Sequence, residues 1–295
     1  MKTLSFGEIV WDVIQGREHL GGAPLNLAAH LAQMGCASAM ISRLGSDRLG
    51  QAARDAMTRL RMDVVLVQED PVHPTGVVDV AVDDRGDPTY TIRETAAYDF
   101  IEQDAMLVRR LAEERFDAFC FGTLAQRNEI SRTTLRQILD TVHASHVLYD
   151  VNLRQQYNDR NVVDDSLRRS TIVKLNDAES RNLCELLFAG PLDEHEFARR
   201  VQTEYEISVV CVTKGARGCS IYVDGRRADF AGHSVEVVDT VGAGDAFSAA
   251  FLFHYGRGGD AAESARVANQ IGAYVASCAG AIPAYDDAVR SLLGL

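Results

Sequence analysis

The sequence predicts an α/β fold with a mostly parallel central sheet and a small β-sheet lid. From about residue 102 onward, helical segments alternate with short apolar strands, which is typical of βα units in a parallel sheet. The segments 77–82 and 89–93 are rich in β-formers and flank a turn-forming stretch at 83–87, so they predict a hairpin outside this alternation. Together with the segment around residues 12–20, this hairpin is interpreted as the lid.

Length and composition set the scale of the fold. The chain has 295 residues and is 46% hydrophobic, which suffices for one large α/β core with a small appendage or for two domains. No linker rich in Pro, Gly or Ser divides the chain. We therefore expect a single domain over residues 1–295, with lid segments at about 11–21 and 75–95.

Charge and cysteine content exclude several functional classes. The net charge of −12 and the pI of about 5.1 argue against a nucleic-acid surface. Six scattered cysteines without a C-x-x-C pair fit reduced core residues of a cytoplasmic protein. No signal peptide is evident, and no apolar run is long enough to span a membrane. We therefore expect a cytoplasmic protein with a small-molecule substrate and neither a nucleic-acid nor a membrane partner.

The N-terminal segments place two polar residues near a strand end. A first strand is expected over residues 3–10, with Asp12 at its C-terminal end, where open α/β sheets bind ligands. Spacing alone favours a solvated loop carboxylate for Asp12 over a ligand. The first helix begins near Pro24, which suits the first turn, and ends before Gly35. Asn26 in its first turn fits either a cap or a ligand to a sugar hydroxyl.

The βα units that follow supply further candidates at strand ends. Strands are expected over 118–121, 147–151, 172–175 and 208–212, and helices over about 103–114, 131–143, 177–187 and 193–205. Arg154 follows the second of these strands and fits either a ligand contact or a surface salt bridge. Asn176 and Glu179 follow the third strand and also match a capping box. Thr213, Gly215 and Gly218 follow the fourth strand, where a hairpin turn is the alternative.

The stretch 237–247 organises the rest of the chain. A β-branched run ends at Asp239, and Gly242 and Gly244 then precede a small, apolar helical segment that Asp245 opens. A helix beginning at two glycines presents bare N–H groups and its positive dipole end to an anion. A carboxylate at the same tip supplies a base for an attacking hydroxyl, as phosphoryl transfer requires. The alternative is an ordinary strand–turn–helix junction with an Asp cap.

The two glycine-containing motifs carry a family resemblance. Residues 239–245 match every fixed position of Asp-Thr-x-Gly-Ala-Gly-Asp, the C-terminal signature of the ribokinase-like (PfkB) carbohydrate kinases. Gly21-Gly22-Ala23-Pro24-Leu25-Asn26 resembles their N-terminal signature, in the version common in the fructokinase-like branch. The resemblance extends from Gly7-Glu8 to Gly280-Ala281. It implies a three-layer α/β/α sandwich of the ribokinase-like type with a small β-sheet lid.

The resemblance also implies roles for individual residues. Asp245 would be the catalytic base, and the backbone amides of Gly242, Ala243 and Gly244 would hold the transferring phosphoryl group. The implied sugar contacts are Asp12, Gly22, Asn26 and Arg154. Apart from the resemblance, the segment 96–101 is expected to bring the aromatic side chain of Tyr98 back over the pocket as a further sugar contact. The implied nucleotide contacts are Lys174, Thr213, Gly215, Gly218 and Asn269. Asn176 and Glu179 would help to hold Mg²⁺, partly through water, and the Asp239 region with the carbonyls of 278–281 would offer a site for a monovalent cation such as K⁺.

The predicted function is ATP-dependent phosphorylation of a sugar primary hydroxyl, with D-fructose converted to D-fructose 6-phosphate. The alternatives are a kinase of the same fold for 2-keto-3-deoxygluconate, ribose or a nucleoside, and a sugar sensor without catalytic activity. The expected ligands are ATP and Mg²⁺, with K⁺ as an open prediction. A homodimer formed through the lid is also expected.

Overall fold

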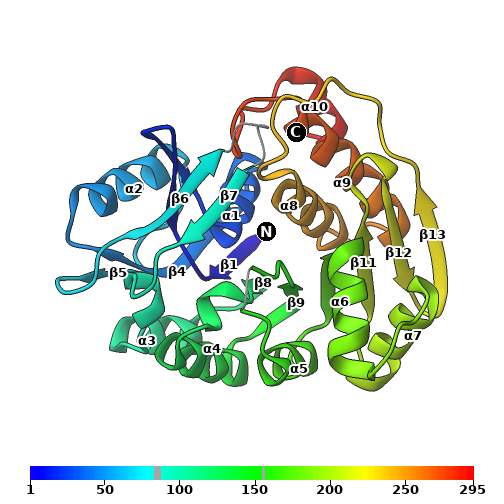
Figure 1. The fold of residues 1–295 in the computed structure, drawn as a ribbon, viewed down its shortest axis with the longest axis horizontal. Helices are drawn as coiled ribbons and strands as arrows, with labels where there is room; N and C mark the ends of the chain where they lie inside the picture. The colour runs from blue at the N-terminus through cyan, green and yellow to red at the C-terminus, as the bar shows by residue number, and fades with distance from the viewer. Residues whose placement is uncertain (83–87, 155–156) are drawn as a thin grey trace.

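The computed structural model describes residues 1–82, 88–154 and 157–295, and its strands form two sheets (Figure 1). The central nine-stranded sheet has the order β13-β12-β11-β10-β9-β8-β1-β4-β5. Neighbouring strands pair in parallel from β11 to β5, whereas β12 and β13 extend the sheet in antiparallel fashion. Its strands are β1 (Lys2–Phe6), β4 (Ala37–Gly45), β5 (Val67–Asp70), β8 (Phe116–Gly122), β9 (Ala144–Asp150), β10 (Ile172–Asn176), β11 (Val209–Thr213), β12 (Cys219–Val223) and β13 (Arg226–Phe230).

Helices cover both faces of this sheet, which confirms the predicted three-layer sandwich (Figure 1). One face carries α3 (Ala105–Glu113), α4 (Glu129–Thr141), α5 (Arg160–Arg168), α6 (Asp177–Phe188) and α7 (Glu194–Tyr205). The other face carries α1 (Ala23–Gln33), α2 (Arg48–Arg59), α8 (Ala243–Tyr255), α9 (Ala261–Ala276) and α10 (Asp287–Leu293). Three short 3₁₀ helices complete the fold: η1 (Ala97–Phe100), η2 (Leu124–Gln126) and η3 (Gly215–Arg217).

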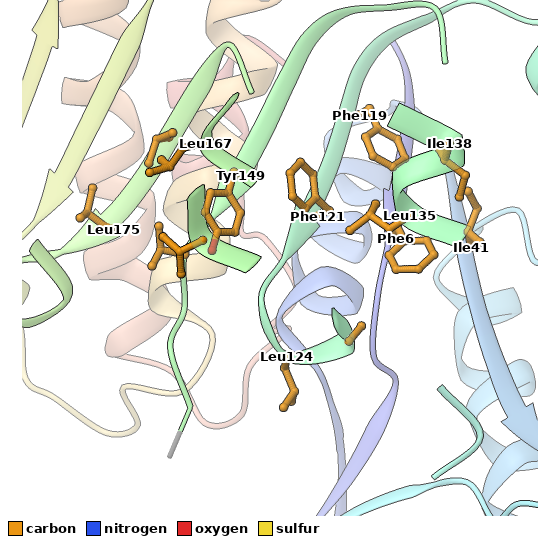
Figure 2. Close-up of a cluster of buried hydrophobic side chains, with 14 of the residues drawn as sticks. Phe6, Ile41, Phe119, Phe121, Leu124, Leu135, Ile138, Tyr149, Leu167 and Leu175 are labelled. Atoms are coloured by element: carbon orange, nitrogen blue, oxygen red, sulfur yellow. The ribbon is translucent and has the colours of Figure 1, made fainter. Parts of the chain in front are cut away.

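The strand residues alternate between the two helical layers, as the period of two along a strand requires. In β8, Phe119 and Phe121 belong to the core under α3–α7, whereas Ala118 and Cys120 belong to the core under α8 and α9. Figure 2 shows part of the first core, where Phe119 packs near Leu135 and Ile138 of α4. The sheet is therefore buried on both sides, and its ligands must lie at its edges and strand ends.

The small sheet has the order β3-β2-β6-β7 and matches the predicted lid segments. Its strands are β2 (Val10–Ile14), β3 (Arg17–Gly21), β6 (Gly76–Val82) and β7 (Pro88–Ile92). β2 pairs with β3 and β6 pairs with β7 in antiparallel fashion, while β2 and β6 run parallel. The predicted turn at 83–87 lies outside the described residues.

Two strand predictions need correction. The predicted strand over 3–10 is broken, because β1 ends at Phe6 and the chain enters the small sheet at Val10. Gly7 allows this break, since it has φ 149° and a Cβ there would lie 2.5 Å from the Pro24 side chain. The β-branched run before Asp239 is not a strand, and Val237 and Val238 are each 59% exposed. Propensity alone does not make a strand where no partner strand supplies a ladder.

The predicted capping box and the free thiols are both present. Asn176 caps α6 in a full capping box with Glu179. At the start of α2, Asp47 accepts a hydrogen bond from Gly50 N–H. The six cysteines have free thiols, and all except Cys278 are buried. None of the helices in the described part of the chain is both long and apolar enough to cross a bilayer.

Candidate active site

Helix α8 begins at a close approach of two backbones. Gly242 is its N-cap with φ 79°, and a Cβ at this position would lie 2.5 Å from the carbonyl oxygen of Ala281. Only glycine fits this conformation and this contact. The following N–H groups lie in the first turn of the helix, where donors lack intrahelical partners. One of the predicted donors is already engaged, because Ala243 N–H donates to the Thr240 carbonyl at 3.3 Å.

Asp245 and Asn26 meet across the site. The Nδ2 amide of Asn26, in the first turn of α1, donates to Oδ2 of Asp245 at 2.8 Å. The contact joins α1 to α8, which pack side by side (Figure 1). Desolvation and the Asp150 carboxylate raise the pKa of Asp245 to about 6, against the opposing effects of Lys174, Asn26 and Arg154. Asp245 is therefore ionised at neutral pH yet basic enough to accept a proton.

A buried ion pair lies beneath this helix tip. Lys174 Nζ lies 3.1 Å from both carboxylate oxygens of Asp150, and the Ser248 hydroxyl donates to Asp150 Oδ2 at 2.9 Å. A Cβ at Gly244 would lie 2.9 Å from Lys174 Nζ. Desolvation opposes the ammonium charge, but the carboxylates of Asp150, Asp245 and Glu179 raise the pKa of Lys174 overall. Lys174, predicted to contact nucleotide, lies under the glycines and is paired with Asp150; the nucleotide contact stays a prediction.

Carboxylates and one guanidinium surround the side of the site that faces the small sheet. Desolvation raises the pKa of Asp12 and raises that of Glu8 to about 7, while the charge of Arg154 lowers the pKa of both and that of Asp245. Arg154 is exposed, whereas Glu8 is buried and its Oε2 has no hydrogen-bond partner among the described residues. Glu8 also lines a cavity of about 10 Å³, which has room for roughly one water molecule.

Two further sugar-contact predictions have clear positions. Gly22 precedes α1 with φ 114°, and a Cβ there would lie 2.5 Å from the Glu8 carbonyl oxygen, so the backbones pass in contact. Tyr98 has no exposed surface; its ring lies under Gly76 and against the Arg127 guanidinium, 4.9 Å away. Tyr98 therefore packs in the core against the small sheet and does not cover the pocket.

A large cavity of about 660 Å³ opens on the other side of the α8 tip. Its wall includes the predicted nucleotide contacts Thr213, Gly215, Gly218 and Asn269, together with Ala243 and Gly244 of the helix tip. His233, Val235 and Val237 also line it and were not predicted. The cavity and Asp245 thus lie on opposite sides of one helix N-terminus, where a phosphoryl group can pass between two bound substrates.

The predicted magnesium ligands have their oxygens partly engaged. Asn176 Oδ1 accepts the N–H groups of Ala178 and Glu179, each at 2.9 Å. Glu179 accepts Asn176 N–H at 2.7 Å and Leu153 N–H at 3.0 Å, one on each oxygen. Each carboxylate oxygen retains one lone pair, so Glu179 fits contact with Mg²⁺ through water better than a closed protein cage. Within the described residues, no group of three or more His, Cys, Asp or Glu side chains is placed to hold a metal.

Asp239 fastens the C-terminal segment to the glycine turn. Its Oδ1 accepts Val241 N–H at 3.0 Å and its Oδ2 accepts Gly280 N–H at 3.3 Å. The side chain thus organises the backbone where a monovalent cation was predicted. The cation itself stays a prediction.

Comparison with known proteins decides the family. A sequence model described as pfkB family carbohydrate kinase matches residues 2–288. The chain belongs to the pfkB family of carbohydrate kinases. This pfkB kinase is 32% identical to a fructokinase of Escherichia coli over 79% of the chain and 75% of the relative. It is 30% identical to a fructokinase of Klebsiella pneumoniae over 99% of both chains.

The fold of this pfkB kinase is shared with solved structures. The fructokinase of Vibrio cholerae O395, in a form with bound fructose, ADP and calcium ion, has a TM-score of 0.84 and 24% identity, covering 99% of this chain and 98% of the other. This likeness confirms the ribokinase-like fold that the motifs predicted, and the family match identifies the chain as a sugar kinase.

Sequence reasoning missed the interior of the site. It did not pair Lys174 with Asp150 or include Ser248 and Glu8 among the functional residues. A signal was present, because Lys174 and Asp150 each interrupt or end an apolar strand. Buried charges are normally paired, so two such residues at neighbouring strand ends indicate a salt bridge.

Proposed function

We propose that this chain is an ATP-dependent kinase that transfers a phosphoryl group to the 6-hydroxyl of D-fructose. The observation that carries the proposal is the position of Asp245 at the N-terminus of α8, where it accepts a hydrogen bond from Asn26 while its neighbours Ala243 and Gly244 line the 660 Å³ cavity. This arrangement brings together a base, an anion-binding helix tip and room for a nucleotide. The fructokinase relatives support fructose as the acceptor.

The proposed mechanism uses residues of this chain in defined roles. The sugar lies between the small sheet and α1, where Asp12, Asn26 and the backbone at Gly22 contact its hydroxyls. Asp245 takes the proton from the primary hydroxyl as its oxygen attacks the γ-phosphorus of ATP in line. The backbone N–H groups of Gly242 and Gly244 hold the developing charge, with that of Ala243 joining them only if it leaves the Thr240 carbonyl; removing such donors typically costs about 10²–10³-fold in rate.

The nucleotide side has a separate set of residues. The adenosine part of ATP occupies the large cavity, with Thr213, Gly215, Gly218 and Asn269 along its wall. Asn176 and Glu179 would hold Mg²⁺ through water at the α6 N-terminus. The metal ion would neutralise phosphate charge. The ammonium of Lys174, buried next to Gly244, adds fixed positive charge beneath the same phosphates.

The charge balance of the sugar side favours a neutral sugar over a sugar acid. Arg154 is the cation whose charge acts on Glu8, Asp12 and Asp245 together. With these carboxyl groups around Arg154, the described residues of the sugar side leave no surplus positive charge for the carboxylate of 2-keto-3-deoxygluconate. Fructose, which carries no charge, binds without that conflict.

A phosphorylation screen tests the substrate. The purified chain is incubated with MgATP and fructose, ribose, 2-keto-3-deoxygluconate or a nucleoside, and product is identified by ³¹P NMR. We expect the highest kcat/KM with fructose and phosphate on carbon 6. Preference for the sugar acid would contradict the charge argument, and failure with every sugar would favour a sensor without catalytic activity.

A variant tests the base. Asp245→Asn keeps the size of the side chain and its contact with Asn26, so we expect fructose and ATP binding by calorimetry to persist. Because a positioned base contributes about 10²–10⁴-fold, kcat should fall by that factor. Near-normal turnover in a folded variant would remove Asp245 from this role. A homodimer through the small sheet stays a prediction that light scattering tests.

A further inference from the structure

The segment 280–285, called here the C-terminal strap, packs directly against the glycine turn of the site. A Cβ at Gly242 would lie 2.5 Å from the carbonyl oxygen of Ala281 and 2.7 Å from its Cα. The strap is also tied to the turn by Gly280 N–H, which donates to Asp239 at 3.3 Å. The position of the first glycine amide therefore depends on the position of the strap.

Helix α1 holds the strap at three points. His30 Nε2 lies 3.0 Å from the carbonyl oxygen of Ala281, and His30 Nδ1 lies 2.7 Å from the Tyr285 hydroxyl. Gln33 Nε2 donates to the Pro283 carbonyl at 3.2 Å. The His30 side chain has no exposed surface, and its ring stacks on Tyr285 with centroids 5.6 Å apart.

The partners of His30 fix its protonation state and tautomer. A carbonyl oxygen can only accept, so Nε2 carries the proton and donates to Ala281. Nδ1 is then the acceptor, and the Tyr285 hydroxyl donates to it. Desolvation lowers the pKa of His30 to about 4, so the ring is neutral at physiological pH. The ring is thus an oriented connector between helix and strap rather than an acid or base of the reaction.

The same helix carries a proposed sugar contact. Asn26 lies one helical turn before His30, and its amide donates to Asp245 at 2.8 Å. Residues four apart lie on one face of a helix. Helix α1 therefore contacts the proposed base through Asn26, and through His30 it contacts the Ala281 carbonyl that packs against the glycine turn. The apolar side chain of Ile282 in the strap also packs in the cluster that includes Trp11 and Leu20 of the small sheet.

We infer that His30 is a positioning residue for phosphoryl transfer, which fixes the Ala281 carbonyl and through it the Gly242 turn relative to Asp245. The inference rests on the proposed role of that turn in holding the phosphoryl group. Its consequence is a loss of kcat without a loss of sugar affinity when the bond to Ala281 is removed. A role limited to core packing would instead lower stability alone.

Two amide variants separate these roles, because each retains a different one of the two bonds. His30→Gln places an amide nitrogen near the position of Nε2, so it keeps a donor for Ala281. His30→Asn reaches only to the position of Nδ1, so it keeps a partner for Tyr285 and loses Ala281. Tyr285→Phe is the matched control, since it removes the other bond of the ring and leaves the Ala281 bond in place.

The experiment measures kcat, sugar KM and melting temperature for the wild type and the three variants, at a temperature where circular dichroism shows each to be folded. We expect His30→Asn to lose about 10- to 100-fold in kcat, since a misplacement of about 1 Å can cost 10²-fold. Its sugar KM should stay within about twofold of the wild type. His30→Gln and Tyr285→Phe should keep kcat within about threefold, although both melt at lower temperature.

Four results would overturn the inference. Equal kcat losses in His30→Gln and His30→Asn would mean that the Ala281 bond is not the determinant. A normal kcat in folded His30→Asn would reduce His30 to core packing, and a rise in sugar KM with unchanged kcat would indicate distortion of α1 at Asn26. A wild-type protein that phosphorylates no sugar would overturn the proposed function as well, so the two failures are distinguishable.

Discussion

The raised pKa of Asp245 predicts an acid limb in the pH profile of the enzyme. The pKa is about 6, compared with 3.8 for an ordinary aspartate, because desolvation and the Asp150 carboxylate disfavour its charge. A base must be deprotonated to act, so kcat/KM should rise with pH through about 6. At pH 5 only about one-tenth of the enzyme has the ionised carboxylate, so kcat/KM should be about tenfold below its plateau. With an ordinary pKa, the loss at pH 5 would be under about 10%.

The assay is the initial rate with fructose at saturating MgATP between pH 4.5 and 8.5. Glu8 is a second group that titrates beside Asp245, with a pKa of about 7, so its charge contributes to the profile. Glu8→Gln removes that titration and should leave one limb of unit slope with a midpoint near 6. The residual activity of Asp245→Asn should lack this limb. A midpoint below about 4.5 in Glu8→Gln, or the same limb in Asp245→Asn, would refute the assignment of the base.

Three further predictions concern the interior of the site. Lys174→Met leaves the buried carboxylate of Asp150 without its partner, so the free energy of unfolding in urea should fall by about 3–5 kcal/mol. Adding Asp150→Asn to this variant should restore part of that free energy. A loss under about 1 kcal/mol in Lys174→Met would contradict the burial of this pair. Gly242 has φ 79°, and the Cβ of Gly242→Ala would press on the C-terminal strap, so kcat of this variant should fall more than tenfold. Gly35 has φ 84°, but a Cβ there would meet no atom within 4 Å. Gly35→Ala should therefore lose stability without losing kcat. If kcat fell equally in the two glycine variants, the cause would be backbone strain at a positive φ and not contact with the strap. His30 has a folded pKa of about 4, below its unfolded value near 6.5, so the unfolded state binds more protons and stability is lost as pH falls through this range. Between pH 7 and pH 4.5, the free energy of unfolding of the wild type in urea should fall by about 2–3 kcal/mol more than that of His30→Gln. If the stability difference between the two proteins did not change with pH, His30 would not be buried in its neutral form.

The parts of the site that rest on local chain geometry were predictable from the sequence. Gly242 and Gly244 before a helix indicate an anion-binding turn wherever they occur, because the physics of a helix N-terminus is local. The same holds for Asn176 and Glu179, whose spacing specifies a capping box that the structure contains. The nucleotide role of the loop at Thr213 stays a prediction from the family resemblance, and the structure places this loop on the wall of the large cavity.

The parts that depend on tertiary placement were not predictable in the same way. Val237 has a high strand propensity but lies exposed beside a cavity, since no neighbouring strand is available to it. Lys174 lies at the end of a strand that faces a ligand site, yet its ammonium turns to Asp150 on the adjacent strand. Tyr98 is buried under the small sheet because Gly76 leaves room for its ring. Each case is decided by a neighbour far away in the chain.

The bond between Asn26 and Asp245 joins residues 219 positions apart. The chain emerges from the ribosome N-terminus first, so the residues of α1 are synthesised long before those of α8, which carries the proposed base. A truncated polypeptide that stops before residue 245 carries Asn26 without its hydrogen-bond partner, the proposed base. On the proposed mechanism, phosphoryl transfer therefore requires residues 245–295 as well as the first turn of α1.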